Sequence, residues 1–577
     1  MSRSYPVLVA GGGPAGLAAA LELAQAGVRC AVVEPRTSVT TDRPRAKTTS
    51  ARTMELFRRW GLADRVRAAT PVPVSHAQDA VFCSRLAGHE ITRFRNAFAM
   101  HDGRRDEIAE SGRQIPQPVV EQVLRDAVAA APTVDLLLGH RLVTAVDGED
   151  GVVARVASPA GAEVEVHAGY LLGCDGATGV TRDVAGARYE GRSGELPNLN
   201  VTFEAPDLER LVCARGAHYW VLGTDAAGIV GRMDLRGTWW AVAQGVRSGV
   251  DPVALVRRLA GVDLDVTVRA TDPWSARMLL ADRYRGRRSF LVGDAAHLNP
   301  PWGGHGYNTG VGDAVNLAWK VGAVVTGWAG PALLDSYEPE RRPVAARTID
   351  AAGAQDSRLA GSFAHPDLDR DDEAGRRRRA IVADDVAVKR GEFHSLGLVL
   401  GYHYADSPAV VDDGSAVPPD DLITYHGSAR PGARLPHRWL PDGSSLYDHL
   451  GRGFTLLRLD ARADAEAVRA AAASSAVPLR VLDRGDLPGA DLPDAPARRV
   501  ARRRPRRGRG GARRCARRPG RPRARPPLTH HLPRPPGHRE PPSRRRCRGG
   551  GRAARGAAQP RRRVVRPPPV AGPLGRV

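Results

Sequence analysis

The first thirty or so residues constrain the fold of this chain most strongly. The apolar run YPVLVA is followed by GGGPAG, by an Ala/Leu-rich segment and by VRCAVVE, a pattern that predicts strand, turn, helix and strand. Gly11, Gly13 and Gly16 have G-x-G-x-x-G spacing, and Glu34 ends the second predicted strand. In such a unit the glycines permit a tight turn, close approach of a pyrophosphate and helix–strand packing, while the acid accepts hydrogen bonds from a ribose. The sequence therefore predicts a dinucleotide-binding α/β unit.

A second glycine-rich stretch, residues 289–322, reads as a short strand, a loop and a long helix. SFLV is apolar and β-prone, and Asp294 follows it with a carboxyl group that needs a partner. Pro300 and Pro301 cannot continue the strand, because proline lacks the N–H that a ladder uses. The glycines of the loop let backbone approach a ligand, and a helix opening near Asn308 favours an electron-rich group at its N-terminus.

Two further segments are predicted to be sheet. Residues 134–173 alternate well enough for three or four strands and lead to Asp175 and Gly176, where an apolar strand again stops. Residues 186–285 read as mostly antiparallel strands, a natural wall for a substrate. Five large side chains there either line a pocket or form ordinary sheet core, with core favoured for each: Tyr219, Trp220, Met233, Trp239 and Trp240.

The remaining patterns are mainly helical. A helix is predicted from about Ser50 until Gly61 stops it, and another within 113–130. Helix is also expected over 335–350, and residues 351–425 are expected to be helical and charged.

Composition excludes several classes of protein. The net charge of +22 suggests a nucleic-acid partner, but 28 arginines and a single acid, Glu540, lie beyond residue 497, which leaves the body mildly acidic. The six cysteines contain no CxxC pair, so we expect no metal site, no disulfide framework and a reducing cytoplasm. The apolar N-terminal run contains a triple glycine and Glu22, so we do not expect a signal peptide, and no apolar run is long enough to span a bilayer.

The pattern fails from about Ala495, where the chain becomes Arg, Pro, Gly and Ala with few aliphatic residues. Residues 495–577 are compatible with a basic nucleic-acid-binding tail, with a disordered linker, or with a shifted reading frame in a GC-rich gene. The last interpretation is favoured, because these residues have GC-rich codons and the segment lacks Lys and Tyr. Such a tail cannot bury enough apolar surface to fold.

Three of these stretches together resemble the motifs of class A FAD-dependent aromatic hydroxylases, the para-hydroxybenzoate-hydroxylase-like monooxygenases. They are GGGPAG with Glu34, CDG at 174–176, and GDAAH…PPWGGHGYNTGVGDAVNLAWK. The resemblance spans roughly residues 5–490 and is to the polyketide and phenol hydroxylase branch, which has a C-terminal thioredoxin-like domain. It implies an α/β fold made of an FAD-binding Rossmann-like domain of glutathione-reductase type (1–75, 105–185 and 280–400), an inserted, mostly antiparallel β-sheet substrate domain (76–104 and 186–279), and an incomplete thioredoxin-like domain (401–494).

The resemblance also implies residue roles. The residues expected to bind FAD are Gly11, Gly13, Ala15, Gly16, Glu34, Arg45, Gln117, Asp175, Gly176, Asp294, Pro301, Gly304, Gly306, Tyr307 and Asn308. Asp294 would hold the ribityl chain, and the backbone from Pro301 to Asn308 would lie along the flavin ring. From local sequence alone, Arg45 could be a solvated loop residue and Gln117 could cap a helix. Gly179 and Thr181 replace the usual serine and valine of the second motif, which leaves the NAD(P)H contacts there open.

The implied activity is hydroxylation of a phenolic or polyketide-type small molecule by a flavin hydroperoxide, with FAD as cofactor, NADPH or NADH as co-substrate, and O2. No general base is named, and Arg45 and His305 are the candidates for a contribution to chemistry near the flavin. His305 could contact substrate or only space the turn. Baeyer–Villiger oxidation and epoxidation of a polyketide intermediate are the alternatives, and nucleic-acid binding by the tail is an alternative of another class. We expect a cytoplasmic monomer or homodimer without membrane or nucleic-acid partners.

Overall fold

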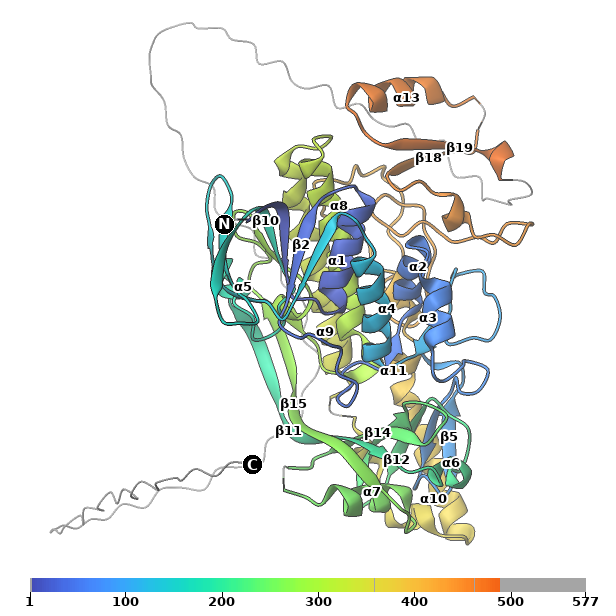
Figure 1. Cartoon of the computed structure of the whole chain (residues 1–577). Helices are drawn as coiled ribbons and strands as arrows, with labels where there is room; N and C mark the ends of the chain where they lie inside the picture. Colours follow the sequence, from blue (N-terminus) through green and yellow to red (C-terminus); the bar gives the residue numbers. More distant parts are fainter. Residues whose placement is uncertain (1–2, 248, 357, 461, 488–577) are drawn as a thin grey trace, which may run out of the picture. The chain divides into compact units, whose positions relative to one another are not determined.

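The computed structural model describes residues 3–247, 249–356, 358–460 and 462–487, and the predictions made for residues 495–577 lie outside this range. Two large sheets organise the described chain (Figure 1). The first has the strand order β7-β2-β1-β10-β9-β8, and β16 also pairs with β10. Its strands are β1 (Arg3–Ala10), β2 (Cys30–Glu34), β7 (Val134–Leu138), β8 (Arg141–Asp147), β9 (Val152–Ala157), β10 (Glu163–Gly173) and β16 (Ser289–Leu291). The predicted opening unit and the four strands of 134–173 are confirmed.

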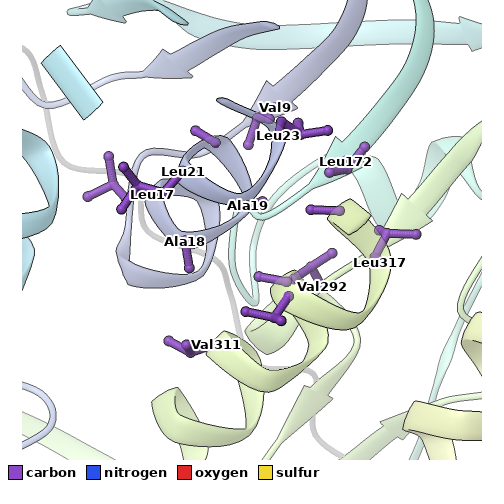
Figure 2. Packing of buried hydrophobic residues seen from close by; sticks show 14 of the residues in the cluster. Val9, Leu17, Ala18, Ala19, Leu21, Leu23, Leu172, Val292, Val311 and Leu317 are labelled. Atoms are coloured by element: carbon purple, nitrogen blue, oxygen red, sulfur yellow. The ribbon is translucent and has the colours of Figure 1, made fainter. Parts of the chain in front are cut away.

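Helices α1 (Pro14–Gln25) and α8 (Gly306–Val325) pack together over this sheet (Figure 2). Pro14 is the first residue of the helix, a position whose N–H has no partner within the helix, so the missing N–H of proline costs no hydrogen bond. Leu17 and Val311 are fully buried in the same cluster as strand residues such as Val9. The helices come close because their contact is made of small residues. A Cβ atom at Gly310 would lie 3.0 Å from the Cα atom of Gly293 and 3.7 Å from the Cβ atom of Ala15.

The second sheet has eight strands in the order β17-β15-β11-β14-β13-β12-β4-β5. They are β4 (Ala80–Cys83), β5 (Glu90–Phe94), β11 (Tyr189–Glu204), β12 (His218–Leu222), β13 (Ala227–Arg232), β14 (Thr238–Gln244), β15 (Thr267–Ala281) and β17 (His297–Leu298). All pairs are antiparallel except β4 with β12. The long strands β11 and β15 pair with each other and lead into this sheet (Figure 1). The antiparallel prediction is confirmed.

Four of the five large side chains are buried core residues of this sheet, divided between its two faces. Trp220 and Trp240 belong to one buried cluster, and Tyr219 and Trp239 belong to the cluster on the other face. Met233 packs against the first cluster. Adjacent residues of a strand point to opposite faces, so no single pocket can be lined by both members of Tyr219–Trp220 or Trp239–Trp240.

Helices and short elements complete the description. The helices are α2 (Ala51–Arg59), α3 (Ala63–Ala69), α4 (Gln117–Ala129), α5 (Thr181–Val184), α6 (Leu208–Leu211), α7 (Pro252–Ala260), α9 (Tyr337–Gly353), α10 (Glu373–Val386), α11 (Arg390–Phe393), α12 (Leu396–Leu400) and α13 (Ala465–Ser474). A small sheet pairs β3 (Thr48–Thr49) with β6 (Arg113–Gln114). None of the described helices has the length and hydropathy needed to cross a bilayer. The predicted helices at Ser50, 113–130 and 335–350 are confirmed.

The region after α12 differs from its prediction. Residues 401–425 contain no helix, because Pro408, Gly414, Pro418 and Pro419 interrupt any helical run. A β-α-β unit follows, in which β18 (Phe454–Arg458) and β19 (Leu479–Asp483) are parallel neighbours joined through α13. The thioredoxin-like assignment of residues 401–494 stays a prediction.

Candidate functional site

Four strand ends meet at one edge of the first sheet. Ala10 pairs with Val33 of β2 and Gly173 of β10, and Gly173 pairs with Leu291 of β16. These strands are mutually parallel, so their carboxyl ends share an edge, where ligands of open α/β sheets bind. The residues that end or follow these strands are Glu34, Gly11, Asp175 and Asp294. The three motifs, far apart in the sequence, thus lie side by side.

The three glycines of the first motif have different surroundings. A Cβ atom at Gly11 would lie 2.2 Å from the carbonyl oxygen of Cys174, and one at Gly16 would lie 1.9 Å from the carbonyl oxygen of Gly11. Gly11 also has φ of 100°, which L side chains rarely adopt. Nothing in the described part of the chain lies within 4 Å of a Cβ atom at Gly13. The protein itself requires Gly11 and Gly16, whereas the space at Gly13 is open to a ligand.

Glu34 is buried and held in place by its neighbours. One carboxylate oxygen accepts the N–H of Gly12 at 2.7 Å, and the other accepts the N–H and Nε–H of Arg36 at 2.9 and 2.7 Å. A carboxylate offers about four acceptor positions, so one remains for a hydroxyl group. Gly12 also belongs to the site, because a Cβ atom there would lie 2.8 Å from the Cβ atom of Glu34. The G-x-G-x-x-G spacing does not include this residue.

The departures in the second motif have a local explanation. The carboxylate of Asp175 accepts hydrogen bonds from the N–H of Thr181 at 3.0 Å and from the Thr181 hydroxyl. A Cβ atom at Gly179 would lie 2.0 Å from the carboxyl carbon of Asp175. Burial raises the pKa of Asp175, and the bonds from Thr181 oppose that shift. Gly179 therefore leaves room for the Asp175 side chain, and Thr181 holds it by two hydrogen bonds. Valine at position 181 could not supply the bond from the hydroxyl group.

A chain of contacts joins the second motif to the third. The guanidinium carbon of Arg182 lies 4.0 Å from the ring centroid of Tyr189, and the Tyr189 hydroxyl donates to the main-chain carbonyl of Asp294. The Asp294 carboxylate itself accepts no hydrogen bond from any described residue. Burial raises the pKa of Asp294, while the positive charges of His297 and Arg45 act in the opposite direction. Asp294 thus presents an unpartnered carboxyl group at the strand edge.

A buried ionic network, not anticipated from the sequence, supports the Gly293–Asp294 turn from behind. Asp313 of α8 accepts bonds from the Nε2 of His297 at 2.7 Å, the N–H of Gly293 at 3.2 Å and the Nε of Arg341 at 2.7 Å. Burial opposes ionisation of Asp313, but Arg341 and His297 outweigh it, so its pKa lies below the usual range. An acid within an apolar, buried helix was the signal that could have located this network.

The loop after Pro301 is fastened to the segment that carries Arg45. The amide nitrogen of Asn308 donates to the carbonyls of Thr48 and Gly304, and its oxygen accepts from the N–H of Ser50 and the hydroxyl of Thr53. Tyr307 bonds to Thr49 through their hydroxyl groups. All four hydrogen-bonding positions of the Asn308 side chain are used in this attachment, so Asn308 fixes the loop after Pro301.

Arg45 and Gln117 are placed by the same segment. The side-chain oxygen of Gln117 accepts the N–H of Ala46 at 3.3 Å, and the Gln117 N–H donates to the Ala46 carbonyl at 2.8 Å. Pro116 is the cap residue of α4, so the capping role suggested for Gln117 is wrong. Arg45 is exposed and forms no hydrogen bond or ion pair with a described residue. Gln117 therefore holds the loop that presents a free guanidinium near Asp294.

A cavity of about 300 Å³ opens beside the loop. Gly303, Gly304 and His305 line one side, and Phe98, Ile108, Leu396 and Val399 are among its apolar walls. His305 is 8 % exposed, and burial lowers its pKa to about 4. Neither ring nitrogen of His305 forms a hydrogen bond with a described residue. The cavity therefore has a neutral, unpartnered imidazole at the end nearest the loop.

Comparison with known proteins shows the family of the chain. Residues 4–352 match the family described as FAD binding domain. The chain is 34% identical over 519 residues to 4-methyl-5-nitrocatechol 5-monooxygenase from Burkholderia sp, covering 84% of this chain and 89% of the relative. It is 32% identical over 498 residues to tetracenomycin B2 monooxygenase-dioxygenase from Streptomyces olivaceus, covering 82% and 87%. The structure of the rebeccamycin biosynthetic enzyme RebC with reduced flavin superimposes with a TM-score of 0.76 at 35% identity, covering 84% of this chain and 91% of that one. The chain belongs to the FAD-dependent monooxygenases that carry this FAD binding domain.

Proposed function

We propose that this enzyme hydroxylates a phenolic or polyketide-type aromatic small molecule, using NAD(P)H and O2, with FAD held at the shared edge of β2, β1, β10 and β16. The observation that carries the proposal is the convergence of three motifs at that edge, with open space at Gly13 and an unpartnered carboxyl group at Asp294. The nitrocatechol and tetracenomycin relatives support an aromatic substrate.

The residues present fit FAD. The open space at Gly13 suits a pyrophosphate at the N-terminus of α1, and the remaining acceptor position of Glu34 suits a ribose hydroxyl. The free carboxylate of Asp294 suits a ribityl hydroxyl, because it is half-buried and a partly desolvated acceptor without a partner gains a hydrogen bond when a donor arrives. The backbone from Pro301 to Asn308, fixed by Asn308, would flank the flavin ring.

The reaction balances as one aromatic C–H, O2, NAD(P)H and a proton giving a hydroxylated product, NAD(P)+ and water. When bound, FAD supplies acceptance of hydride and activation of O2. The protein contributes position and electrostatics. Backbone N–H groups in the first turn of α8, from Gly306 to Asn308, favour negative charge beside the ring. The Arg45 guanidinium adds positive charge within electrostatic reach of Asp294. The apolar cavity walls exclude water from the reacting ring.

The organisation of the rest of the chain is part of the proposal. The predicted substrate segments, 76–104 and 186–279, supply β4, β5 and β11 to β15 of the second sheet, in keeping with a substrate domain. The unit after residue 401 would have no redox role, since the sequence has no CxxC pair. The described thiols at Cys30, Cys83, Cys174 and Cys213 are free, which supports a cytoplasmic location. We propose a monomer or homodimer that acts without nucleic acid.

Spectroscopy and product analysis test the proposal together. The full chain is reconstituted with FAD, NADPH consumption is followed with a panel of phenols and polyketides, and products are examined by mass spectrometry. The expected result is a yellow protein that oxidises NADPH faster with an aromatic partner and adds one oxygen atom to it. Protein that takes up no FAD would overturn the cofactor site. NADPH oxidation without oxygen insertion across the panel would overturn the reaction.

A further inference from the structure

His305 has an imidazole side chain that can donate and accept hydrogen bonds, and it has no role in the proposed binding of FAD. It lies in the loop that would flank the flavin, between Gly304 and the first residue of α8. Its carbonyl accepts bonds from the N–H and hydroxyl of Thr309, which anchor the backbone and leave the ring free. A Cβ atom at Gly303 would lie 2.4 Å from the ring Nε2, so the absence of a side chain at Gly303 makes room for the imidazole. The loop is therefore shaped around this ring.

The imidazole is buried, neutral and without a partner. Its exposed fraction is 8 %, and burial lowers its pKa to about 4. A neutral imidazole has one N–H donor and one acceptor nitrogen. A ring nitrogen without a protein partner is available to a ligand, and a bond to that ligand removes the cost of leaving it unpaired. His305 lines the cavity, so that ligand would lie in the cavity.

The charged side chains and the other histidines of the cavity indicate what kind of ligand fits. Arg105 pairs with Glu107 at 2.9 Å and also contacts the Nε2 of His101 at 3.2 Å. The ring of His394 bonds to the carbonyl of Arg95 at 3.0 Å, and the Arg95 side chain is exposed to solvent. The lining at the loop end consists of glycines, Thr48, Ser50, Asn308 and His305, with no cation among them. No cationic side chain at that end would pair with an anionic substituent, whereas a hydroxyl group would match the imidazole.

We propose that His305 hydrogen-bonds an uncharged phenolic hydroxyl of the substrate and so orients the aromatic ring at the flavin end of the cavity. This inference rests on the proposed hydroxylase function and narrows its substrate class to neutral phenols over aromatic carboxylates. His305 then acts by direct contact with substrate, and its loss affects binding and the fraction of turnover that yields product.

Ligand binding to the FAD-loaded full chain tests this inference without turnover. In the absence of NADPH, 1-naphthol and 1-naphthoate are titrated while the flavin absorbance is followed. Variants are His305→Leu, which fills similar space without hydrogen bonds, and His305→Gln, which keeps a donor and an acceptor. His167→Leu, at an exposed position on β10, is the matched control. The unaltered protein should bind naphthol at least about tenfold more tightly than naphthoate, and His305→Leu should weaken naphthol binding about tenfold, the scale of one lost hydrogen bond with its partner left unpaired. His305→Gln and the control should stay within about threefold.

A second readout separates a substrate contact from a structural role. With NADPH and naphthol, His305→Leu should release more hydrogen peroxide per NADPH consumed, with FAD content unchanged. Equal naphthol affinity in His305→Leu and the unaltered protein, tighter binding of naphthoate than naphthol, or no naphthol binding at all would overturn the inference. Loss of FAD from His305→Leu with naphthol affinity intact would assign the ring to the cofactor instead. Absence of oxygen insertion by the unaltered protein would count against the hydroxylase function, while the naphthol titration would still decide the role of His305.

Discussion

Gly13 and Gly16 belong to one motif, but substituting alanine should have different consequences at the two positions. Alanine at Gly13 should weaken FAD binding, whereas alanine at Gly16 should lower the stability of the fold. Gly13 caps α1 with φ of −76° and ψ of −178°, values open to alanine, and its Cβ atom would meet nothing described within 4 Å. Gly13→Ala should therefore change the free energy of unfolding of the apoprotein by only about 0.5 kcal/mol. If a pyrophosphate occupies that space, the added methyl displaces it. Loss of one charge-assisted bond to phosphate is worth about 1.5–3 kcal/mol, or about 10- to 150-fold in the FAD dissociation constant.

Gly16→Ala should damage the fold itself. Its Cβ atom would lie 1.9 Å from the carbonyl oxygen of Gly11, where normal contact needs roughly 3.5 Å. Alanine gains about 1 kcal/mol of helix propensity, but overpacking against a main-chain oxygen that cannot rotate away costs about 3 kcal/mol or more. The net loss is about 2 kcal/mol.

Urea unfolding of the two apoproteins, followed by tryptophan fluorescence, measures stability, and quenching of FAD fluorescence measures affinity. The reasoning is refuted if Gly13→Ala is as unstable as Gly16→Ala, or if Gly13→Ala binds FAD as tightly as the unaltered protein.

Three other outcomes are expected. Asp294→Ala should lose FAD on gel filtration while the apoprotein stays at least as stable, because removing an unpartnered, half-buried carboxyl group relieves its desolvation; full FAD occupancy would contradict the ribityl role. His218 bonds Gln114 at 2.9 Å, and burial, with a smaller contribution from Lys47, lowers its pKa to about 3. The side chain of His218 titrates near pH 6.5 in the unfolded state, so below that pH the unfolded state binds one proton more than the folded state. The free energy of unfolding is therefore highest above about pH 6.5 and declines toward pH 3 by up to about 1.4 kcal/mol per pH unit. His218→Gln should remove about one proton from the slope of unfolding free energy between about pH 6 and 4.5, and an unchanged slope would show that His218 does not titrate on unfolding. Deleting residues 497–577, which contain 28 arginines, should leave NADPH oxidation unchanged, because the proposed FAD site lies within the described residues; reduced oxidation would show that the tail supports the enzyme, and salt-sensitive DNA binding that disappears on deletion would favour the alternative function of the tail.

The sequence by itself determined the local elements and the motifs. Strand, turn and helix at residues 3–25 follow from alternating and helical apolar patterns and from glycines whose requirements are local. The identity of Asp294 as a polar residue after an apolar strand was also visible. Each of these features depends on residues close in sequence, and so on preferences that a single stretch of chain expresses.

Only the tertiary structure decided how these motifs meet. The bond from Tyr189 to the Asp294 carbonyl spans 105 positions, and Asp313 reaches Arg341 across 28. Such contacts depend on strand order and helix packing, which local patterns do not specify. The same holds for Gly179, whose lack of a side chain makes room for Asp175, and for His305, whose ring is neutral and unpartnered because the fold buries it beside a cavity. Burial and partnership are properties of the assembled chain, and they turn a recognisable motif into a site with defined chemistry.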